Sequence, residues 1–290
     1  MSQSLPIYCI DHFAENDEGR DFDIKDLREL RAKFQFTNYA HRHDFYDILI
    51  VTKGGGTHTI DFTTYEVKPG SIFFLTPGQV HCWELSEDIE GYSIFFKAEF
   101  YLMDCNVQKL LSFPFFHSMT QKPLLTMDCE QDPGFARILQ ELQFENTQNL
   151  LGREDAIRSL LDLLLIRFAR NYTSTYSKYP SQTHLIRQFE MLVEENFASN
   201  KRPGDYAQLM NISAKYLNKL IKNSLGKSPR KVIHDRIILE AKRLLIHSSL
   251  TVSQIAHELG FDDNAYFNRF FKAKAKLTPD QYRRGNIVQY

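Results

Sequence analysis

The sequence repeats one pattern after 50 residues, and this repeat limits the possible folds more than any other feature. Residues 216–222 (YLNKLIK) return as residues 266–272 (YFNRFFK), and a Ser-Pro pair at 228–229 returns as Thr-Pro at 278–279. Upstream of this block the offset falls to 49 residues, and a slip of one residue is absorbed most easily in a turn. Two copies of one supersecondary unit are therefore predicted in the C-terminal third of the chain.

Each copy has the order of a helix-turn-helix: a short helix, a turn residue and a capped second helix. Asn211 stands in the first turn and Gly260 in the second, and both residue types tolerate the positive φ that such a turn needs. Ser213 is placed to cap the helix after the first turn, and Asp262 or Asp263 the helix after the second. The pattern predicts two helix-turn-helix units.

Helical spacing divides the second helix of each unit into an apolar and a polar face. The apolar residues, which we expect to face the core, are Leu217, Leu220, Ile221, Phe267, Phe270 and Phe271. The residues that we assign to DNA contact are Ser213, Lys215, Asn218, Lys219, Lys222, Asn264, Asn268, Arg269 and Lys272. Asn suits a bidentate contact with adenine, and Arg or Lys suits guanine, in a major groove wide enough for a helix. A single polar face is usually only solvated, but the same Asn-then-basic pair in both copies favours DNA reading.

Charge is divided unevenly along the chain, although its net value is only −1. From Gln182 onward there are 18 Lys and Arg against 10 Asp and Glu, a net charge of +8. The remaining residues carry 17 basic and 26 acidic side chains, a net charge of −9. A basic C-terminal region beside an acidic N-terminal region indicates that one domain meets a polyanion, which we take to be double-stranded promoter DNA.

Between the two copies, residues 229–248 have the spacing of one long helix, with apolar residues along one side. A rigid connector would fix the two reading helices relative to each other. We expect them to enter successive segments of the major groove on one face of the DNA, about 34 Å apart.

The region from His184 to Arg284 resembles the DNA-binding domain of the AraC/XylS family of bacterial transcription regulators. The residues that carry the resemblance are Ala207, residues 213–220 and 226–229, Ile255, Ala256, Gly260, Phe261, residues 266–272, Thr278, Pro279, Tyr282 and Arg283. Lys276 departs from the family pattern, which usually has Gly after the second recognition helix. A non-Gly residue in a left-handed C-cap costs about 1 kcal/mol, so this helix end is expected to be slightly strained.

The N-terminal region has a different pattern, with short β-branched and aromatic runs broken by Gly and Pro over residues 39–97. Such runs predict an antiparallel β-barrel or sandwich. Two amphipathic helices follow, one after Asp132-Pro133 and one through residues 157–168, and their apolar stripes suit either packing on the barrel or a dimer contact. The predicted fold class is therefore α+β with several domains: a cupin-like barrel with flanking helices at 1–170, a linker at 171–183 and an all-α domain with two helix-turn-helix units at 184–290.

The run HRHDFYD at 41–47, with Gly54, Gly70, Pro77-Gly78 and His81, resembles the two motifs of the cupin barrel, which is also the usual sensor domain of AraC/XylS regulators. In metal-binding cupins the matching positions, here His41, His43, Asp47 and His81, hold a divalent ion. Alternation along a strand places His41 and His43 on one face, so that chelation is geometrically possible.

Three interpretations of these histidines remain open. A catalytic metal would make the protein a metal-dependent cupin enzyme with an accessory DNA-binding domain. A metal-free pocket lined by His41, His43, Tyr46, His81 and Trp83 would bind a small-molecule effector. The histidines would otherwise be hydrogen-bonded structural residues. Attachment to a DNA reader, and Asp47 in place of the more usual Glu, favour sensing without a metal or other cofactor, and no catalytic residue is assigned.

The whole sequence is thus interpreted as a one-component transcription regulator whose N-terminal barrel binds a small-molecule effector. It shows neither a long apolar run nor a secretory signal, and its four cysteines are scattered, so we expect a cytoplasmic protein without membrane contact. A second copy of the chain and RNA polymerase are the further partners that this interpretation admits.

Overall fold

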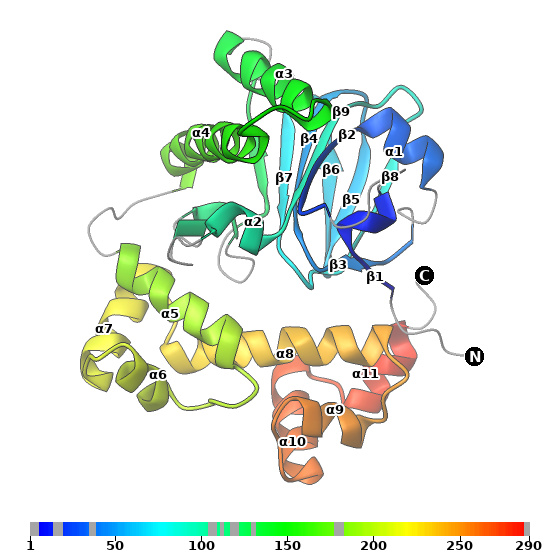
Figure 1. The fold of residues 1–290 in the computed structure, drawn as a ribbon. Helices are drawn as coiled ribbons and strands as arrows, with labels where there is room; N and C mark the ends of the chain where they lie inside the picture. The colour runs from blue at the N-terminus through cyan, green and yellow to red at the C-terminus, as the bar shows by residue number, and fades with distance from the viewer. Residues whose placement is uncertain are drawn as a thin grey trace. The chain divides into compact units, whose positions relative to one another are not determined.

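The computed structural model describes residues 6–13, 20–34, 39–103, 109–110, 113–116, 122–128, 132–176 and 183–286. These residues fall into two compact units that divide after residue 177, and each is described by itself. Figure 1 shows an N-terminal unit of strands and helices and a C-terminal unit of helices alone.

The N-terminal unit is built on two antiparallel sheets. Its longer strands are β2 (Phe22–Asp26), β4 (Tyr46–Lys53), β5 (Gly56–Ile60), β6 (Thr63–Val67), β7 (Ser71–Leu75), β8 (His81–Leu85), β9 (Glu90–Phe96) and β10 (Leu124–Thr126). The five-stranded sheet has the order β10-β7-β4-β9-β2, and the three-stranded sheet the order β6-β5-β8. The antiparallel sheets predicted from residues 39–97 are confirmed, and they share a core. Two short strands, β1 (Ile7–Tyr8) and β3 (Arg42–His43), form a separate parallel pair.

Strand β4 contributes to two hydrophobic cores at once. Leu49 and Val51 pack with residues of the three-stranded sheet, whereas Ile48 and Ile50 pack with helices on the opposite face. All four side chains are 0% exposed. A strand that is covered on both faces needs no polar alternation, which explains the continuous apolar run at 48–51.

Helices α3 (Pro133–Thr147) and α4 (Arg153–Tyr176) cover the outer face of the five-stranded sheet (Figure 1). The helix predicted after Asp132-Pro133 is confirmed as α3. Asp132 caps it, because its Oδ1 accepts from the backbone N–H of Gly134, and Arg167 on α4 donates to Asp132 Oδ2 at 2.8 Å. The apolar stripe of α4, from Ile157 to Phe168, is buried against this sheet. Packing within one chain therefore accounts for the stripe, and the dimer contact stays a prediction. The shorter helical segments of this unit are η1 (Ile10–Phe13), α1 (Leu27–Lys33), α2 (Ala98–Leu102) and η4 (Pro114–Phe116).

The predicted linker at 171–183 is wrong over its first residues. Helix α4 continues through Tyr176, because Tyr172 is 1% exposed and its hydroxyl donates to the Lys122 carbonyl at 2.8 Å. This tertiary anchor overrides the weak helical pattern of the segment. The middle of the expected linker, residues 177–182, lies outside the described residues.

The C-terminal unit consists of helices joined by short connections. They are α5 (Thr183–Asn196), α6 (Pro203–Leu209), α7 (Ala214–Leu225), α8 (Pro229–His247), α9 (Val252–Glu258), α10 (Asn264–Ala275) and α11 (Pro279–Asn286). The long connector predicted at 229–248 is confirmed as α8, with Ser248 as its C-cap. Among the helices that the structure describes, none has the length and apolarity that crossing a membrane requires.

Candidate DNA interface and buried histidine cluster

The first helix-turn-helix unit consists of α6, a turn at Asn211 and α7. Asn211 has a φ of 53°, and the hydroxyl of Ser213 accepts from the Tyr216 backbone N–H at 3.1 Å. Helix α7 ends at Gly226, whose φ of 65° lies in the left-handed region. The turn and the cap predicted for this unit are confirmed.

The second unit repeats this design in α9 and α10. Gly260 has a φ of 66°, and of the two candidate caps Asp263 is the one used, accepting from Ala265 N at 2.7 Å. The departure at Lys276 is accommodated without a change of backbone, because this residue takes a φ of 67° at the end of α10. Lys276 therefore bears the small cost expected for a side chain in this conformation.

The second turn is also held by the segment that precedes α6. A Cβ atom on Gly260 would lie 2.0 Å from the carbonyl oxygen of Ala198. Lys201 Nζ donates to the carbonyls of Ala198 and Gly260, each at 2.6 Å, and lies 4.8 Å from the ring centre of Phe261. The two halves of the C-terminal unit are thus joined by this contact as well as by α8.

The two recognition helices, α7 and α10, bury their predicted apolar faces. All six inward residues are 9% exposed or less, and the basic residues on the opposite faces are exposed. The exposed set comprises Lys215, Asn218, Lys219, Lys222, Asn264, Arg269 and Lys272. The spacing argument therefore assigned these helix faces correctly.

Side chains of the second reading face are partly engaged with one another. Asn264 Nδ2 donates to Ser253 Oγ at 2.6 Å, and Asn268 Nδ2 donates to the Asn264 carbonyl at 2.8 Å. Arg269 lies 3.8 Å from Asp263, but both side chains are more than half exposed, so this ion pair is weak. No such bond among Lys215, Asn218 and Lys219 is described on α7. The asparagines of the second reading face are therefore already hydrogen-bonded within the protein.

Two tyrosines on the recognition helices were not assigned from the sequence. Tyr216 is 40% exposed and Tyr266 is 53% exposed, and they occupy equivalent positions in α7 and α10. Large exposed aromatic rings at matched positions of two recognition helices are suited to contact with DNA. The repeat itself contained this signal, because both tyrosines begin the repeated block.

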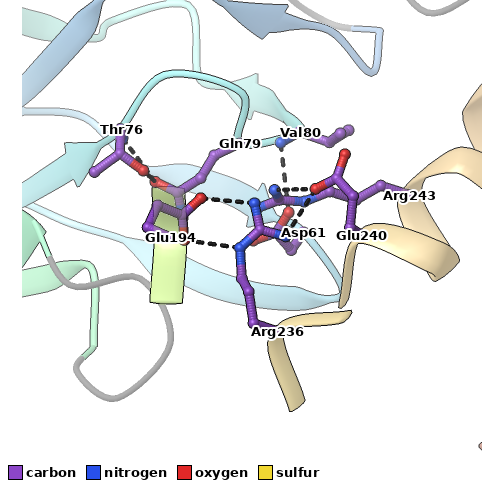
Figure 2. Close-up of polar contacts among 8 residues, drawn as sticks. All are labelled: Asp61, Thr76, Gln79, Val80, Glu194, Arg236, Glu240 and Arg243. Carbon is purple, nitrogen blue, oxygen red and sulfur yellow. Dashed lines mark hydrogen bonds and ion pairs between the residues drawn. The ribbon is translucent and has the colours of Figure 1, made fainter. Parts of the chain in front are cut away.

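A group of charged side chains joins α5 to α8 (Figure 2). Arg236 is 5% exposed, donates to both carboxylate oxygens of Glu194 at 2.7 and 2.6 Å, and reaches Glu240 at 2.9 Å. Burial by itself would raise the pKa of Glu240, but the neighbouring guanidinium groups of Arg236 and Arg243 lower it. Glu240 and both arginines lie on α8, so the contact between the two helices is the paired hydrogen bond from Arg236 to Glu194, which helical periodicity alone could not reveal.

In the N-terminal unit, a second group of polar contacts positions the start of β8 (Figure 2). The backbone N–H and the hydroxyl of Thr76 donate to Gln79 Oε1 at 2.7 and 3.0 Å. The backbone N–H of Val80 donates to Asp61 Oδ1 at 3.4 Å, and Asp61 N donates to the Val80 carbonyl at 2.6 Å. These bonds hold the segment that leads directly into His81.

The three histidines predicted for this site meet at this point. His41 and His81 form an isolated antiparallel bridge, with N–O distances of 3.0 and 2.9 Å, and His43 follows in β3. One imidazole nitrogen from each of the three residues lies within 4.8 Å of the others. All three side chains are buried, at 1%, 5% and 2% exposed for His41, His43 and His81.

His58 is a fourth member of this environment that the sequence did not single out. Its Nε2 lies 3.1 Å from His81 Nδ1, and its side chain is fully buried. Burial lowers the pKa of His58 to about 3 and that of His41 to about 4, and it holds the pKa of His43 and His81 well below the usual value. These imidazoles are therefore neutral at physiological pH.

Of the other residues predicted for this site, Trp83 lies with the histidines, whereas Tyr46 and Asp47 do not join them. Trp83 joins the histidines, with its ring 6.0 Å from His58 and 6.2 Å from His81. Tyr46 does not, because it stacks on Phe96 at 5.3 Å and packs with the helix-covered core. Asp47 also stands apart from the three histidines: its Oδ1 accepts from Ser93 Oγ at 2.6 Å, and burial raises its pKa to about 7 despite this hydrogen bond.

Two helix-turn-helix units with exposed basic faces, in a chain that also carries a β-sheet unit, define a DNA-binding transcription regulator. Residues 28–165 match the AraC-like ligand binding domain, and residues 206–285 match a helix-turn-helix domain. The chain belongs to the AraC/XylS family of transcription regulators.

Individual proteins of known sequence or structure are also similar to this chain. The chain is 22% identical over 249 residues to the HTH-type transcriptional activator RhaR of Escherichia coli K12, covering 85% of this chain and 87% of RhaR. Among solved structures, ToxT from Vibrio cholerae is 16% identical, with 91% of this chain and 98% of ToxT covered and a TM-score of 0.44. The C-terminal domain of the response regulator yesN from Fusobacterium nucleatum is 27% identical, with 34% and 97% covered and a TM-score of 0.33.

Proposed function

We propose that this regulator reads promoter DNA through α7 and α10 together, with the residues assigned from the sequence making the contacts. The observation that carries the proposal is the matched division of both helices, each with three apolar residues buried and a basic face exposed. The +8 charge of the C-terminal region supports it, because phosphate attraction supplies much of the affinity for DNA.

The two units have different tasks in this proposal. The first recognition helix presents Lys215, Lys219 and Lys222, which suit phosphate attraction. The second presents Asn268 and Arg269, which suit adenine and guanine edges. The hydroxyl of Ser213 already accepts the capping hydrogen bond of α7, so its contact with DNA would use the remaining donor capacity of that group.

The test begins with duplexes that the full chain selects from a random DNA pool, because selection reveals the preferred binding site directly. The expected site has two half-sites separated by about one helical turn, or 10 to 10.5 base pairs. Selection of a single short site, unaffected by substitutions in α7, would contradict joint reading by the two helices.

The N-terminal unit is proposed to bind the small-molecule effector, near His41, His43, His81 and Trp83. Trp83 is the single tryptophan of the chain and is 3% exposed, so its fluorescence reports on this region alone. A library of small metabolites would be screened by Trp83 emission and then by the change in DNA affinity. We expect a compound that changes both, and whose binding, measured by calorimetric titration, is weakened in Trp83→Phe. An effector that changes DNA affinity but binds Trp83→Phe as tightly as the parent chain would contradict the placement.

Further aspects of the function are proposed from the relatives. RhaR is named a transcriptional activator, so we propose that this protein activates transcription in the cytoplasm, through contact with RNA polymerase and as a homodimer. We also propose that it is not an enzyme, since its relatives are regulators. Analytical ultracentrifugation of the full chain, with and without DNA, tests the dimer.

A further inference from the structure

We propose that Lys201 determines which spacing between two DNA half-sites this protein accepts, because it holds the two halves of the C-terminal unit in one arrangement. The inference rests on the proposed reading of DNA by α7 and α10 together, and it concerns what fixes these helices relative to each other. The first half contains α5, α6 and α7, and the second contains α9, α10 and α11. Helix α8 links the halves along the chain, and Lys201 adds a noncovalent connection.

Lys201 lies where two helices end. Helix α5 ends at Asn196 and α9 ends at Glu258, and the chain just beyond each end presents a backbone carbonyl to the same ammonium group. Lys201 Nζ donates to the carbonyls of Ala198 and Gly260, each at 2.6 Å. Carbonyls at a helix end lack partners within the helix, and a lysine that donates to them satisfies them. Removal of the ammonium group would leave two carbonyl oxygens of like partial charge close together.

The two backbones are also in direct contact at this point. A Cβ atom on Gly260 would lie 2.0 Å from the Ala198 carbonyl oxygen and 2.8 Å from Lys201 Nζ. The ammonium group lies 4.8 Å from the ring centre of Phe261, which is 5% exposed. A cation beside an aromatic ring that is largely removed from water is attracted to it. Two carbonyls and one ring therefore hold the lysine side chain at the junction between the halves.

The segment that carries Lys201 is anchored in the first half. The hydroxyl of Tyr206 on α6, whose side chain is 0% exposed, donates to the Asn200 carbonyl at 2.8 Å. The guanidinium of Arg236 lies 4.0 Å from the ring centre of Phe197. Any movement of the second turn relative to α6 and α7 would therefore have to break the hydrogen bond from Lys201 to the second half.

A fixed arrangement of α7 and α10 restricts the duplexes that both helices can contact at once. One base pair added between two half-sites moves the second half-site by about 3.4 Å along the duplex and turns it by about 35° around the axis. A rigid unit loses the contacts of one helix on such a duplex, whereas a unit that bends at the junction keeps both. Lys201 thus acts on specificity through the protein and not through a base contact.

The experiment compares duplexes that differ only in spacing. The full chain first selects its site from random DNA, and one base pair is then inserted or deleted between the two half-sites. Anisotropy titrations of labelled duplexes measure the affinity of the parent chain and of Lys201→Met, which keeps a long side chain and removes the charge. We expect the parent chain to prefer the selected spacing about 30- to 100-fold, and Lys201→Met to reduce this preference about 5- to 20-fold.

Lys242→Met is the matched control, because it removes the same charge from another half-buried lysine. Lys242 Nζ lies 5.4 Å from the ring centre of Tyr282 and contacts α11 instead of the junction at Gly260. This variant should keep the parent chain's preference for spacing. On a duplex with one half-site alone, Lys201→Met and Lys242→Met should bind equally tightly. Urea denaturation verifies that each variant is folded.

Two results would overturn the proposal and leave joint reading by α7 and α10 intact. One is a parent chain that selects two half-sites but binds duplexes of changed spacing equally tightly, a result that depends on no variant. The other is a folded Lys201→Met that keeps the parent chain's preference for spacing, or that loses the same affinity for every duplex as a phosphate contact would. Selection of a single short site would overturn both proposals at once, so the two failures are distinguishable.

Discussion

In the first helix-turn-helix unit the turn residue is Asn211, with a φ of 53°, whereas the second unit has Gly260 at 66°. The φ values are similar, so backbone conformation alone does not explain why only the second turn has a glycine. The explanation is contact, because the Ala198 carbonyl occupies the place that a Cβ on Gly260 would take. The helix ends show the opposite arrangement, with Gly226 closing the first recognition helix and Lys276 the second.

The two copies thus have the same backbone conformation at the turn and at the helix end, but different neighbouring residues surround these positions. A Cβ added at Gly226 would meet nothing within 4 Å, and this end of α7 is open enough to accept other residues. Glycine is therefore essential at one of these positions and only favourable at the other. Substitutions in the turns, at the helix ends and on the reading faces test this asymmetry.

Replacing Gly260 by Ala is expected to destabilise the C-terminal unit by about 2 to 4 kcal/mol, since overpacking adds to the cost of a positive φ. Urea denaturation of the full chain would measure the change. Asn211→Ala is the matched variant in the first turn and should cost only about 1 kcal/mol, which is the conformational part. Equal losses in the two variants would show that the Ala198 contact does not distinguish the turns.

Replacing Arg269 by Ala is expected to cost about 1 to 3 kcal/mol of binding free energy and to relax specificity at one base position. Lys222→Ala on the first recognition helix should instead weaken binding evenly across sequences and make its salt dependence shallower. Titrations of selected and random duplexes at several salt concentrations would separate the two behaviours. If Arg269→Ala loses the same affinity for both duplexes, this residue is a phosphate contact and the division between the units is wrong.

Replacing Lys276 by Gly is expected to stabilise the chain by about 1 kcal/mol, because glycine adopts the left-handed conformation at the end of α10 without strain. The reciprocal change in the first unit, Gly226→Lys, should destabilise by a similar amount. Thermal and urea unfolding would record both. A loss of stability in Lys276→Gly would mean that the lysine side chain, whose Nζ donates to the Ala273 carbonyl at 3.3 Å, outweighs the strain.

Replacing Tyr266 by Ala is expected to leave stability nearly unchanged, since the ring is 53% exposed, and to weaken DNA binding by about 0.5 to 1 kcal/mol. Tyr216→Ala tests the equivalent position of α7. Comparing the unfolding curve with the binding isotherm of each variant distinguishes the two effects. A large loss of stability without a change in DNA affinity would make the tyrosines packing residues.

Features that depend on neighbours in the sequence were predicted well. The repeat, the caps at Ser213 and Asp263, the positive φ at Asn211 and the inward faces of α7 and α10 all follow from local conformational preference and helical period. The strands of residues 39–97 were recognisable for the same reason. The linker prediction failed because a distant contact decided the outcome: the Lys122 carbonyl accepts from the Tyr172 hydroxyl and holds the end of α4. The placement of Tyr46 beside the histidines failed for a local reason, because alternation along β4 puts it on the face of Ile48 and Ile50, opposite Leu49 and Val51.

The sequence by itself thus determined that this chain carries a β-sheet domain and two recognition helices, each with a defined apolar and a defined polar face. The reason is that the spacing of apolar residues and the residues that form turns are encoded over a few neighbouring positions. Only the tertiary structure decided which of the candidate side chains meet. His58 joins His81 from another strand, Asp47 turns to Ser93, and Lys201 reaches the Gly260 carbonyl across 59 residues of sequence. Such meetings depend on strand register and helix packing, which arise from the whole core and have no local signature.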